Sequence, residues 1–261
     1  MARQVSNKAD KKSKGKRSST KLLLFAVVLT FIFLVLWFTR PQYTEDTATT
    51  VGMLYIRMER HLFFETDEYV ETAVYVLDET YQSPVIIAEF DRMMLEINPD
   101  FVCWIYIRGT NIDYPVVRAK DNEKYLELTF FGEIDRHGAI FMDYRNVGDI
   151  VPHIIIYGHN TADGTKFGSL RYFLNDNFLQ NNQIITLITN GRTVEYRIFS
   201  VRLTDIYDPA YFLDFSKPGS FSAFLERNGA PYYAAQILTL STCVSRGRDY
   251  DRLIVQGVLI K

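Results

Sequence analysis

Cysteine and histidine are scarce in this chain, which has two cysteines and four histidines in 261 residues. Two cysteines, with no CxxC or HxxxH spacing, cannot build a structural zinc site. A disulfide-rich scaffold is excluded, because Cys103 and Cys243 allow one bridge at most. The GxSxG, Walker and GxGxxG patterns are also absent. The sequence therefore carries no signature of a serine hydrolase, a phosphate-binding loop or a dinucleotide fold.

Neither sign of charge dominates the chain, since its net charge is −2, but positive and negative side chains are distributed unevenly along it. Residues 1–21 hold eight Lys/Arg and one Asp, whereas residues 41–261 hold twenty Lys/Arg and thirty Asp/Glu. An acidic body argues against nucleic-acid binding, so we expect no nucleic-acid partner. A basic tail next to an apolar run indicates a membrane instead.

Residues 22–39 contain no charged side chain. A helix of this length spans roughly 27 Å at about 1.5 Å per residue, just enough for a bilayer core. The run ends in Trp37-Phe-Thr-Arg40-Pro41, which is unlike a cleavage site, although a cleaved signal peptide is the alternative. The positive-inside rule predicts a cytoplasmic tail at 1–21, a signal anchor at 22–39 and export of the rest after a linker at 40–50.

Apolar positions follow a helical period over residues 51–97, Asn98-Pro-Asp100 ends it, and from residue 101 the period shifts toward strands. Helices are also expected at 167–179 and 220–227. Strands are expected at 102–107, 112–117, 138–142, 152–157, 183–189, 192–203, 236–243 and 252–260. Asn190-Gly191 is a strong turn signal between two of them. The sequence thus predicts a mostly β fold, with about eight short strands in a barrel or closed sheet and an N-terminal helical segment.

The last two strands place a thiol next to a positive charge. Cys243 ends one apolar run and Arg252 begins the next, across the polar loop 244–251. In an antiparallel hairpin these two ends face each other. Arg246 and Arg248 lie in the middle of the loop, so Arg252 is the better candidate for a fixed cation. Cys103 lies inside an apolar strand, where a buried thiol behaves as a small hydrophobic residue.

His159 follows the expected strand 152–157, after Tyr157 and Gly158. A histidine and a cysteine at strand ends of one small barrel can meet at one rim, although a lone strand-end histidine is more often structural. The chemistry that fits is attack by a thiolate on an acyl carbon, with the histidine moving protons and a cation steadying the oxyanion. No aspartate is obviously placed to orient His159, although Asp143 and Asp163 lie in nearby loops.

Several motifs together resemble class B sortases, the cysteine transpeptidases of Gram-positive cell walls. They are Thr239-Leu-Ser-Thr-Cys243 with Arg252, Tyr157-Gly-His-Asn160, Phe167-Gly-Ser-Leu170, Gly109-Thr-Asn-Ile-Asp-Tyr-Pro-Val-Val117 and Gly138-Ala-Ile-Phe-Met-Asp-Tyr-Arg-Asn146. The resemblance covers residues 98–261, and the segment 51–97 fits the N-terminal helices of that class. Cys103 departs from the pattern, because the class usually has a small residue such as glycine there.

This resemblance implies a sortase-type eight-stranded β-barrel in residues 98–261 and a catalytic triad of Cys243, His159 and Arg252. Cys243 would attack the threonine carbonyl of a sorting motif, His159 would protonate the leaving amine, and Arg252 would hold the oxyanion. Substrate contacts are expected from four further residues, Ser241, Thr242, Tyr211 and Phe212. No cofactor and no metal are needed.

The resemblance also implies partners and a location. The partners would be secreted proteins with a C-terminal sorting signal, and an amine of a peptidoglycan precursor or a pilin. The enzyme would sit in the cell membrane as a single-pass protein with its catalytic domain outside. The motifs do not separate readers of NPxTN-type signals from readers of (S/P)PxTG-type signals or from pilin polymerases.

Two other functions stay open at this point. One is an extracytoplasmic cysteine hydrolase or peptidase that uses the same cysteine and histidine. The other is a non-catalytic, membrane-tethered binding domain in which Cys243 is merely buried.

Overall fold

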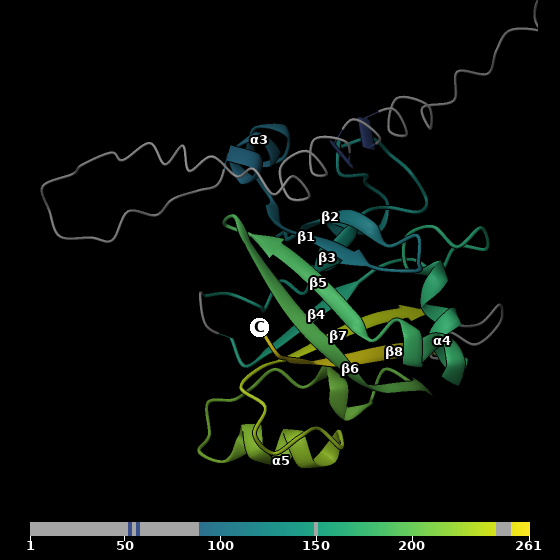
Figure 1. Cartoon of the computed structure of the whole chain (residues 1–261). Helices are drawn as coiled ribbons and strands as arrows, with labels where there is room; N and C mark the ends of the chain where they lie inside the picture. Colours follow the sequence, from purple (N-terminus) through teal and green to yellow (C-terminus); the bar gives the residue numbers. More distant parts are fainter. Residues whose placement is uncertain (1–51, 54–55, 58–88, 149–150, 244–251) are drawn as a thin grey trace, which may run out of the picture. The chain divides into compact units, whose positions relative to one another are not determined.

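The computed structural model describes residues 52–53, 56–57, 89–148, 151–243 and 252–261 (Figure 1). The basic tail 1–21, the apolar run 22–39, the linker 40–50 and most of the segment 51–97 lie outside the described residues. The predictions made for those parts of the chain therefore stay predictions.

Eight strands of the described residues close into a barrel in the order β1-β2-β3-β4-β7-β8-β6-β5. The strands are β1 Phe101–Ile107, β2 Asp113–Val117, β3 Ile140–Met142, β4 His153–Tyr157, β5 Ile184–Thr189, β6 Arg192–Thr204, β7 Ile237–Cys243 and β8 Arg252–Leu259. This confirms the predicted mostly β, eight-stranded closed sheet.

Short helices lie between and before the strands. They are α3 Glu89–Ile97, η1 Lys124–Leu126, η2 Gly168–Leu174, α4 Asp176–Asn181, η3 Pro209–Tyr211 and α5 Ser220–Arg227. The helix expected at 167–179 is divided into η2 and α4, because Asn175 adopts an extended conformation and caps α4 by accepting a hydrogen bond from the Phe178 amide.

The alternation of side chains along β1 shows how the barrel is filled. Cys103, Ile105 and Ile107 point into the barrel and belong to its interior apolar cluster. Trp104 points outward into a second cluster, where its ring meets Phe90 of α3 at 5.9 Å between ring centres. The departure at Cys103 is therefore a buried thiol that fills space inside the barrel.

The turn between β5 and β6 has the geometry that its sequence predicts. Asn190 and Gly191 have φ angles of 50° and 66°. Two successive positive φ angles define the turn that suits a two-residue hairpin, and Asn-Gly adopts it at low cost. The side chain of Asp91 on α3 accepts a hydrogen bond from the Gly191 amide, which joins the helix to this turn.

Two strand pairs, β2 with β3 and β4 with β7, are parallel, and the other six described pairs are antiparallel. The parallel pairing of β4 and β7 matters most for the site, because both strands then end at the same rim (Figure 1). The outer face of β7 carries Thr239, Ser241 and Cys243, while Leu238 and Leu240 fill the barrel.

Candidate active site

Cys243 and Arg252 are direct partners in the antiparallel ladder of β7 and β8. Directly paired residues project from the same side of a sheet, so the thiol and the guanidinium leave the barrel on its outer face. The Cys243 side chain is exposed, and Cys103 and Cys243 are both free thiols. The arrangement that the sequence predicted for this hairpin is therefore present, although its loop, 244–251, lies outside the described residues.

β4 brings His159 to the same rim. Tyr157 of β4 is in register with Ser241 of β7, and the Gly158 amide donates to the Ser241 carbonyl at 3.3 Å. The Thr242 hydroxyl donates to the Gly158 carbonyl at 2.7 Å, which ties the two strand ends together. His159 and Cys243 are the next residues after these contacts in their two segments, so both belong to this rim.

A backbone carbonyl, and not an aspartate, contacts the His159 ring. Nε2 of His159 lies 2.9 Å from the carbonyl oxygen of Leu126. A carbonyl oxygen can only accept, so Nε2 carries the proton in this contact, and Nδ1 is the ring nitrogen that the contact leaves unused. Sequence reasoning missed this contact, because any residue at position 126 offers a carbonyl and no side-chain pattern marks it.

The two aspartates near His159 in sequence have other partners. Asp143 is fully buried and accepts hydrogen bonds from Arg145 and from the Tyr157 hydroxyl. Burial alone would raise the pKa of Asp143, but the contacts with Arg145 and Tyr157 outweigh it and hold that pKa below its usual value. Asp163 accepts from the Thr165 amide and hydroxyl.

Helix η1 presents the Leu126 carbonyl, and the contacts of its side chains fix it in place. The Tyr125 hydroxyl donates to Asp100 at 2.8 Å and is also bonded to Asn98. Lys124 forms an ion pair with the same Asp100 at 2.7 Å. The His159 ring is therefore oriented by a segment anchored at the start of β1.

Of the four residues expected to contact substrate, two are joined to each other. The Tyr211 hydroxyl lies 2.8 Å from Oγ of Ser241. Burial raises the pKa of Tyr211, while the hydrogen bond with Ser241 and the charge of Arg252 act in the opposite direction. Tyr211 is therefore near enough to feel the charge at the cysteine and arginine end of the hairpin.

Thr242 and Phe212 have different surroundings. Thr242 is buried, and its hydroxyl is used by the contact with Gly158. The Phe212 ring is 41% exposed and meets Phe215 edge-on, with 5.3 Å between ring centres. Thr242 thus holds the strand ends together, whereas Phe212 presents an apolar edge to solvent.

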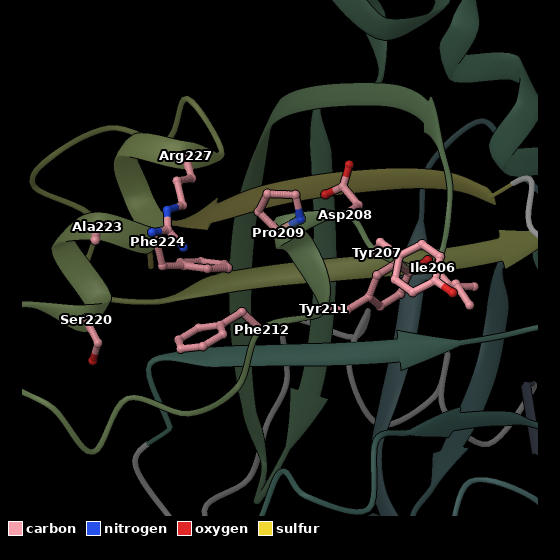
Figure 2. Close-up of a pocket in the computed structure, with 10 residues that line it drawn as sticks. All are labelled: Ile206, Tyr207, Asp208, Pro209, Tyr211, Phe212, Ser220, Ala223, Phe224 and Arg227. Atoms are coloured by element: carbon pink, nitrogen blue, oxygen red, sulfur yellow. The ribbon is translucent and has the colours of Figure 1, made fainter.

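A pocket of ≈ 480 Å³ lies within the connection between β6 and β7, lined by residues 206–209, 211 and 212 on one side and by α5 on the other (Figure 2). We call residues 208–212, which include η3, the covering turn. Figure 2 labels its members Asp208, Pro209, Tyr211 and Phe212 together with Phe224 and Arg227 of α5. The lining of the pocket is mostly apolar, and Tyr211 is the lining residue that also contacts Ser241 of β7.

Comparison with known proteins identifies the family. Residues 105–260 match the family model described as the sortase domain. The chain belongs to the sortase family. Its curated relatives include sortase B of Listeria monocytogenes, 34% identical over 65% of this chain and 73% of that protein, and sortase B of Staphylococcus aureus, 32% identical over 64% and 72%.

Solved sortase structures agree with the class. Clostridium perfringens sortase B is 32% identical, with a TM-score of 0.61 over 66% of this chain and 100% of that one. A Staphylococcus aureus sortase B–substrate complex is 26% identical, with a TM-score of 0.68 over 83% of this chain and 98% of that one. The chain is therefore a class B sortase, a cysteine transpeptidase of the cell surface.

Two further features of this sortase concern the predicted anchor and the expected lack of a cofactor. Among the described residues, no helix is long and apolar enough to cross a bilayer, and the run 22–39 falls outside them. Across the same part of the chain, no group of three His, Cys, Asp or Glu side chains could hold a metal ion. The predictions of a single-pass anchor and of no cofactor both stay predictions.

Proposed function

We propose that this sortase is anchored by residues 22–39 and cleaves a C-terminal sorting signal of secreted proteins after threonine, transferring the acyl group to an amine of the cell wall or of a pilin. Cys243 is the nucleophile, His159 the proton carrier and Arg252 the oxyanion cation. The observation that carries this proposal is the meeting of the β4, β7 and β8 ends at one rim, with Cys243 paired to Arg252.

In the first step the Cys243 thiolate attacks the threonine carbonyl carbon. The carbonyl oxygen takes the negative charge, and the nearby Arg252 guanidinium stabilises it. The carbon–nitrogen bond then breaks, the leaving amine takes a proton from the imidazolium of His159, and a thioester remains on Cys243.

In the second step an incoming amine attacks the thioester. Its nitrogen loses a proton to the neutral imidazole of His159, the new amide forms and the Cys243 thiolate leaves. The Leu126 carbonyl supports this cycle, because it keeps Nε2 protonated and so leaves Nδ1 as the nitrogen that exchanges the proton. The ring therefore begins and ends the cycle in the same protonation state.

The substrate groove follows the outer face of β4 and β7, with the covering turn as one wall. Ser241 and Tyr211 support this assignment, since their hydroxyl groups meet two residues before Cys243 on that face. The exposed Phe212 edge gives the same wall an apolar surface for the side chains of a sorting motif. Thr242 contributes by holding the strand ends in register.

A membrane anchor would raise the enzyme's local concentration where secreted substrates emerge. The basic residues of 1–21 support a cytoplasmic N-terminus, and the charge-free run 22–39 supports a single span. An amine as the transfer partner is supported by one related sortase B structure, 25% identical with a TM-score of 0.69, which is a complex with triglycine.

The test incubates the full-length protein with two quenched peptides, one carrying an NPxTN signal and one an SPxTG signal, with and without triglycine. We expect a peptide–triglycine conjugate from the wild type and from Cys103→Ala, and none from Cys243→Ala. If cleavage yields the free acid whether or not triglycine is present, the protein is a cysteine hydrolase. If neither peptide is cleaved and a methanethiosulfonate reagent does not label Cys243, the protein is a binding domain.

A further inference from the structure

His153, the first residue of β4, is a buried histidine with both ring nitrogens in use. The residue is 1% exposed. Nδ1 lies 2.9 Å from the carbonyl oxygen of Phe212, and Nε2 lies 2.8 Å from Oγ1 of Thr239. The ring also packs on Phe224 of α5, with 4.6 Å between ring centres. Two hydrogen bonds and one ring contact fix its position and its orientation.

The partners decide where the protons are. The Phe212 carbonyl can only accept, so Nδ1 of His153 carries the proton and donates it. Nε2 is then the acceptor, and the Thr239 hydroxyl donates to it. Burial in apolar surroundings lowers the pKa of His153 to about 4, so the ring is neutral at neutral pH and this tautomer is the one that satisfies both contacts.

The hydrogen bonds continue from Thr239 across the sheet. Nε2 of Gln256 donates to the Thr239 hydroxyl oxygen at 3.0 Å, and Oε1 of Gln256 accepts from Arg202 at 2.7 Å. Arg202 also donates to both carboxylate oxygens of Asp208, at 3.0 and 2.6 Å. A continuous polar chain therefore runs beneath the covering turn, from Asp208 at its start to the Phe212 carbonyl at its end.

Each end of the covering turn is held by this chain, and its middle faces the groove. At the start, Asp208 accepts hydrogen bonds from the Ala210 amide and the Thr204 hydroxyl as well as from Arg202. At the end, the hydrogen bond to the Phe212 carbonyl comes from His153. Between them Tyr211 reaches Ser241. Loss of the His153 contact would release the end of the turn that carries Tyr211 and Phe212.

We propose that His153 is a positioning residue for substrate binding: its Nδ1–H holds the Phe212 carbonyl and thereby fixes Tyr211 and Phe212 as a wall of the groove. This inference rests on the proposed function, because the wall matters only if the groove binds a sorting signal. His153 lies at the start of β4, at the opposite end of the strand from His159, and takes no part in proton transfer to the substrate.

Two substitutions at residue 153 separate hydrogen bonding at each ring nitrogen. In His153→Asn the amide nitrogen stands close to the position of Nδ1 and can still donate to the Phe212 carbonyl. In His153→Gln the amide stands close to the position of Nε2, so the contact with Thr239 is kept and the contact with Phe212 is lost. His137→Asn and His137→Gln are matched controls, because His137 lies in a loop and its side chain is 40% exposed.

The first readout is the kinetics of the full-length protein on whichever quenched peptide, NPxTN or SPxTG, the wild type cleaves better. We expect His153→Gln to raise KM about tenfold with little change in kcat, because one buried hydrogen bond is lost from the wall and none from the reacting groups. His153→Asn and both His137 variants should stay within about twofold of the wild type. Equal KM values for the Asn and Gln variants, or a loss confined to kcat, would overturn the proposal.

The second readout needs no substrate. Hydrogen–deuterium exchange of the full-length protein should be about tenfold faster for the amides of Tyr211 and Phe212 in His153→Gln than in wild type or His153→Asn. Those amides bond to the Asp208 and Pro209 carbonyls within the turn, so their exchange reports its opening. Unchanged exchange in His153→Gln would refute the positioning role even if both peptides fail as substrates, in which case the proposed function fails separately.

A third variant covers the case in which His153→Gln does not fold. Thr239→Val removes the hydroxyl that donates to Nε2 and leaves both His153 and Phe212 in place. Without that donor, the ring keeps only one of the two hydrogen bonds that fix its orientation, so the Nδ1–H contact with the Phe212 carbonyl is held less firmly. We expect KM to rise about threefold and exchange at Tyr211 and Phe212 to quicken. No change in either quantity would overturn the proposed role of the tautomer.

Discussion

Replacing Thr242 with valine tests whether the join between β4 and β7 aligns the reacting groups. Valine has nearly the same shape as threonine, so the change removes little except the hydroxyl that donates to the Gly158 carbonyl at 2.7 Å. That contact lies one residue before both His159 and Cys243. The substitution should therefore loosen the rim without removing either reacting side chain.

The expected loss of stability follows from the burial of the Thr242 side chain. Thr242 is 4% exposed, and losing one buried hydrogen bond of this kind lowers the free energy of unfolding by about 1–2 kcal/mol. For a domain of this size that corresponds to a fall in Tm of roughly 2–8 °C. Activity should fall further than stability suggests, by about tenfold in kcat, because a small displacement of a proton carrier is costly.

Thr189→Val is the matched control. The Thr189 hydroxyl donates to the Val102 carbonyl at 3.1 Å, which is the same kind of contact between two neighbouring strands. It joins β5 to β1, away from the β4 and β7 ends. We expect Thr189→Val to lower Tm by less, because Thr189 is only half-buried, and to leave kcat within about twofold of the wild type.

The assay measures Tm by calorimetry and steady-state cleavage of a quenched sorting-signal peptide for both variants. If Thr242→Val and Thr189→Val lose the same activity, or if neither loses any, then the tie between Thr242 and Gly158 does not align the site. A change in KM alone would point to the groove wall instead of the rim.

Further predictions concern acid stability, thiol reactivity and the oxyanion cation. Burial lowers the pKa of His153 from 6.5 in the unfolded chain to about 4 in the native protein, so the unfolded chain binds a proton first as the pH falls. The free energy of unfolding should therefore decrease between pH 6.5 and pH 4, by about 3 kcal/mol in all, and level off below pH 4. Urea titrations of wild type and His153→Asn at several pH values measure this decrease, and parallel pH profiles for the two proteins would contradict it. In the native protein the exposed Cys243 should react with a methanethiosulfonate reagent, whereas Cys103 should not, because burial raises the pKa of the Cys103 thiol to about 12. Two fast-reacting thiols in a stopped-flow titration would refute this. Arg252→Ala should lower kcat about a hundredfold and Arg246→Ala much less, and equal losses in peptide cleavage would move the oxyanion role elsewhere.

The sequence was most informative where local rules decide the structure. Asn190-Gly191 predicts its hairpin because both residues tolerate positive φ. The pair of Cys243 and Arg252 follows for the same reason, since a hairpin brings the end of one strand to the start of the next whatever its loop does. Such inferences need no knowledge of distant contacts.

Inference from sequence was weaker where segments far apart in the chain meet. Nothing in the sequence of residues 153–157 indicates that β4 pairs in parallel with β7, eighty-four residues later along the chain. The contact of His159 with the Leu126 carbonyl was also beyond reach, because a main-chain oxygen has no sequence signal. Asp143 and Asp163 were the side chains considered for orienting His159, and the backbone serves there instead.

His153 at the start of β4 and His159 just after its end show how one strand can position groups with different tasks. His153 is the first residue of β4, and His159 comes two residues after the strand ends at Tyr157. His153 starts the strand beneath the apolar cover of α5, where burial keeps its ring neutral and both nitrogens bonded. His159 follows the strand at the half-buried rim, where Nε2 is bonded to the Leu126 carbonyl and Nδ1 is the nitrogen proposed to transfer protons. Position along the strand, and not residue type, therefore separates the histidine proposed to hold the groove wall from the histidine proposed to carry protons.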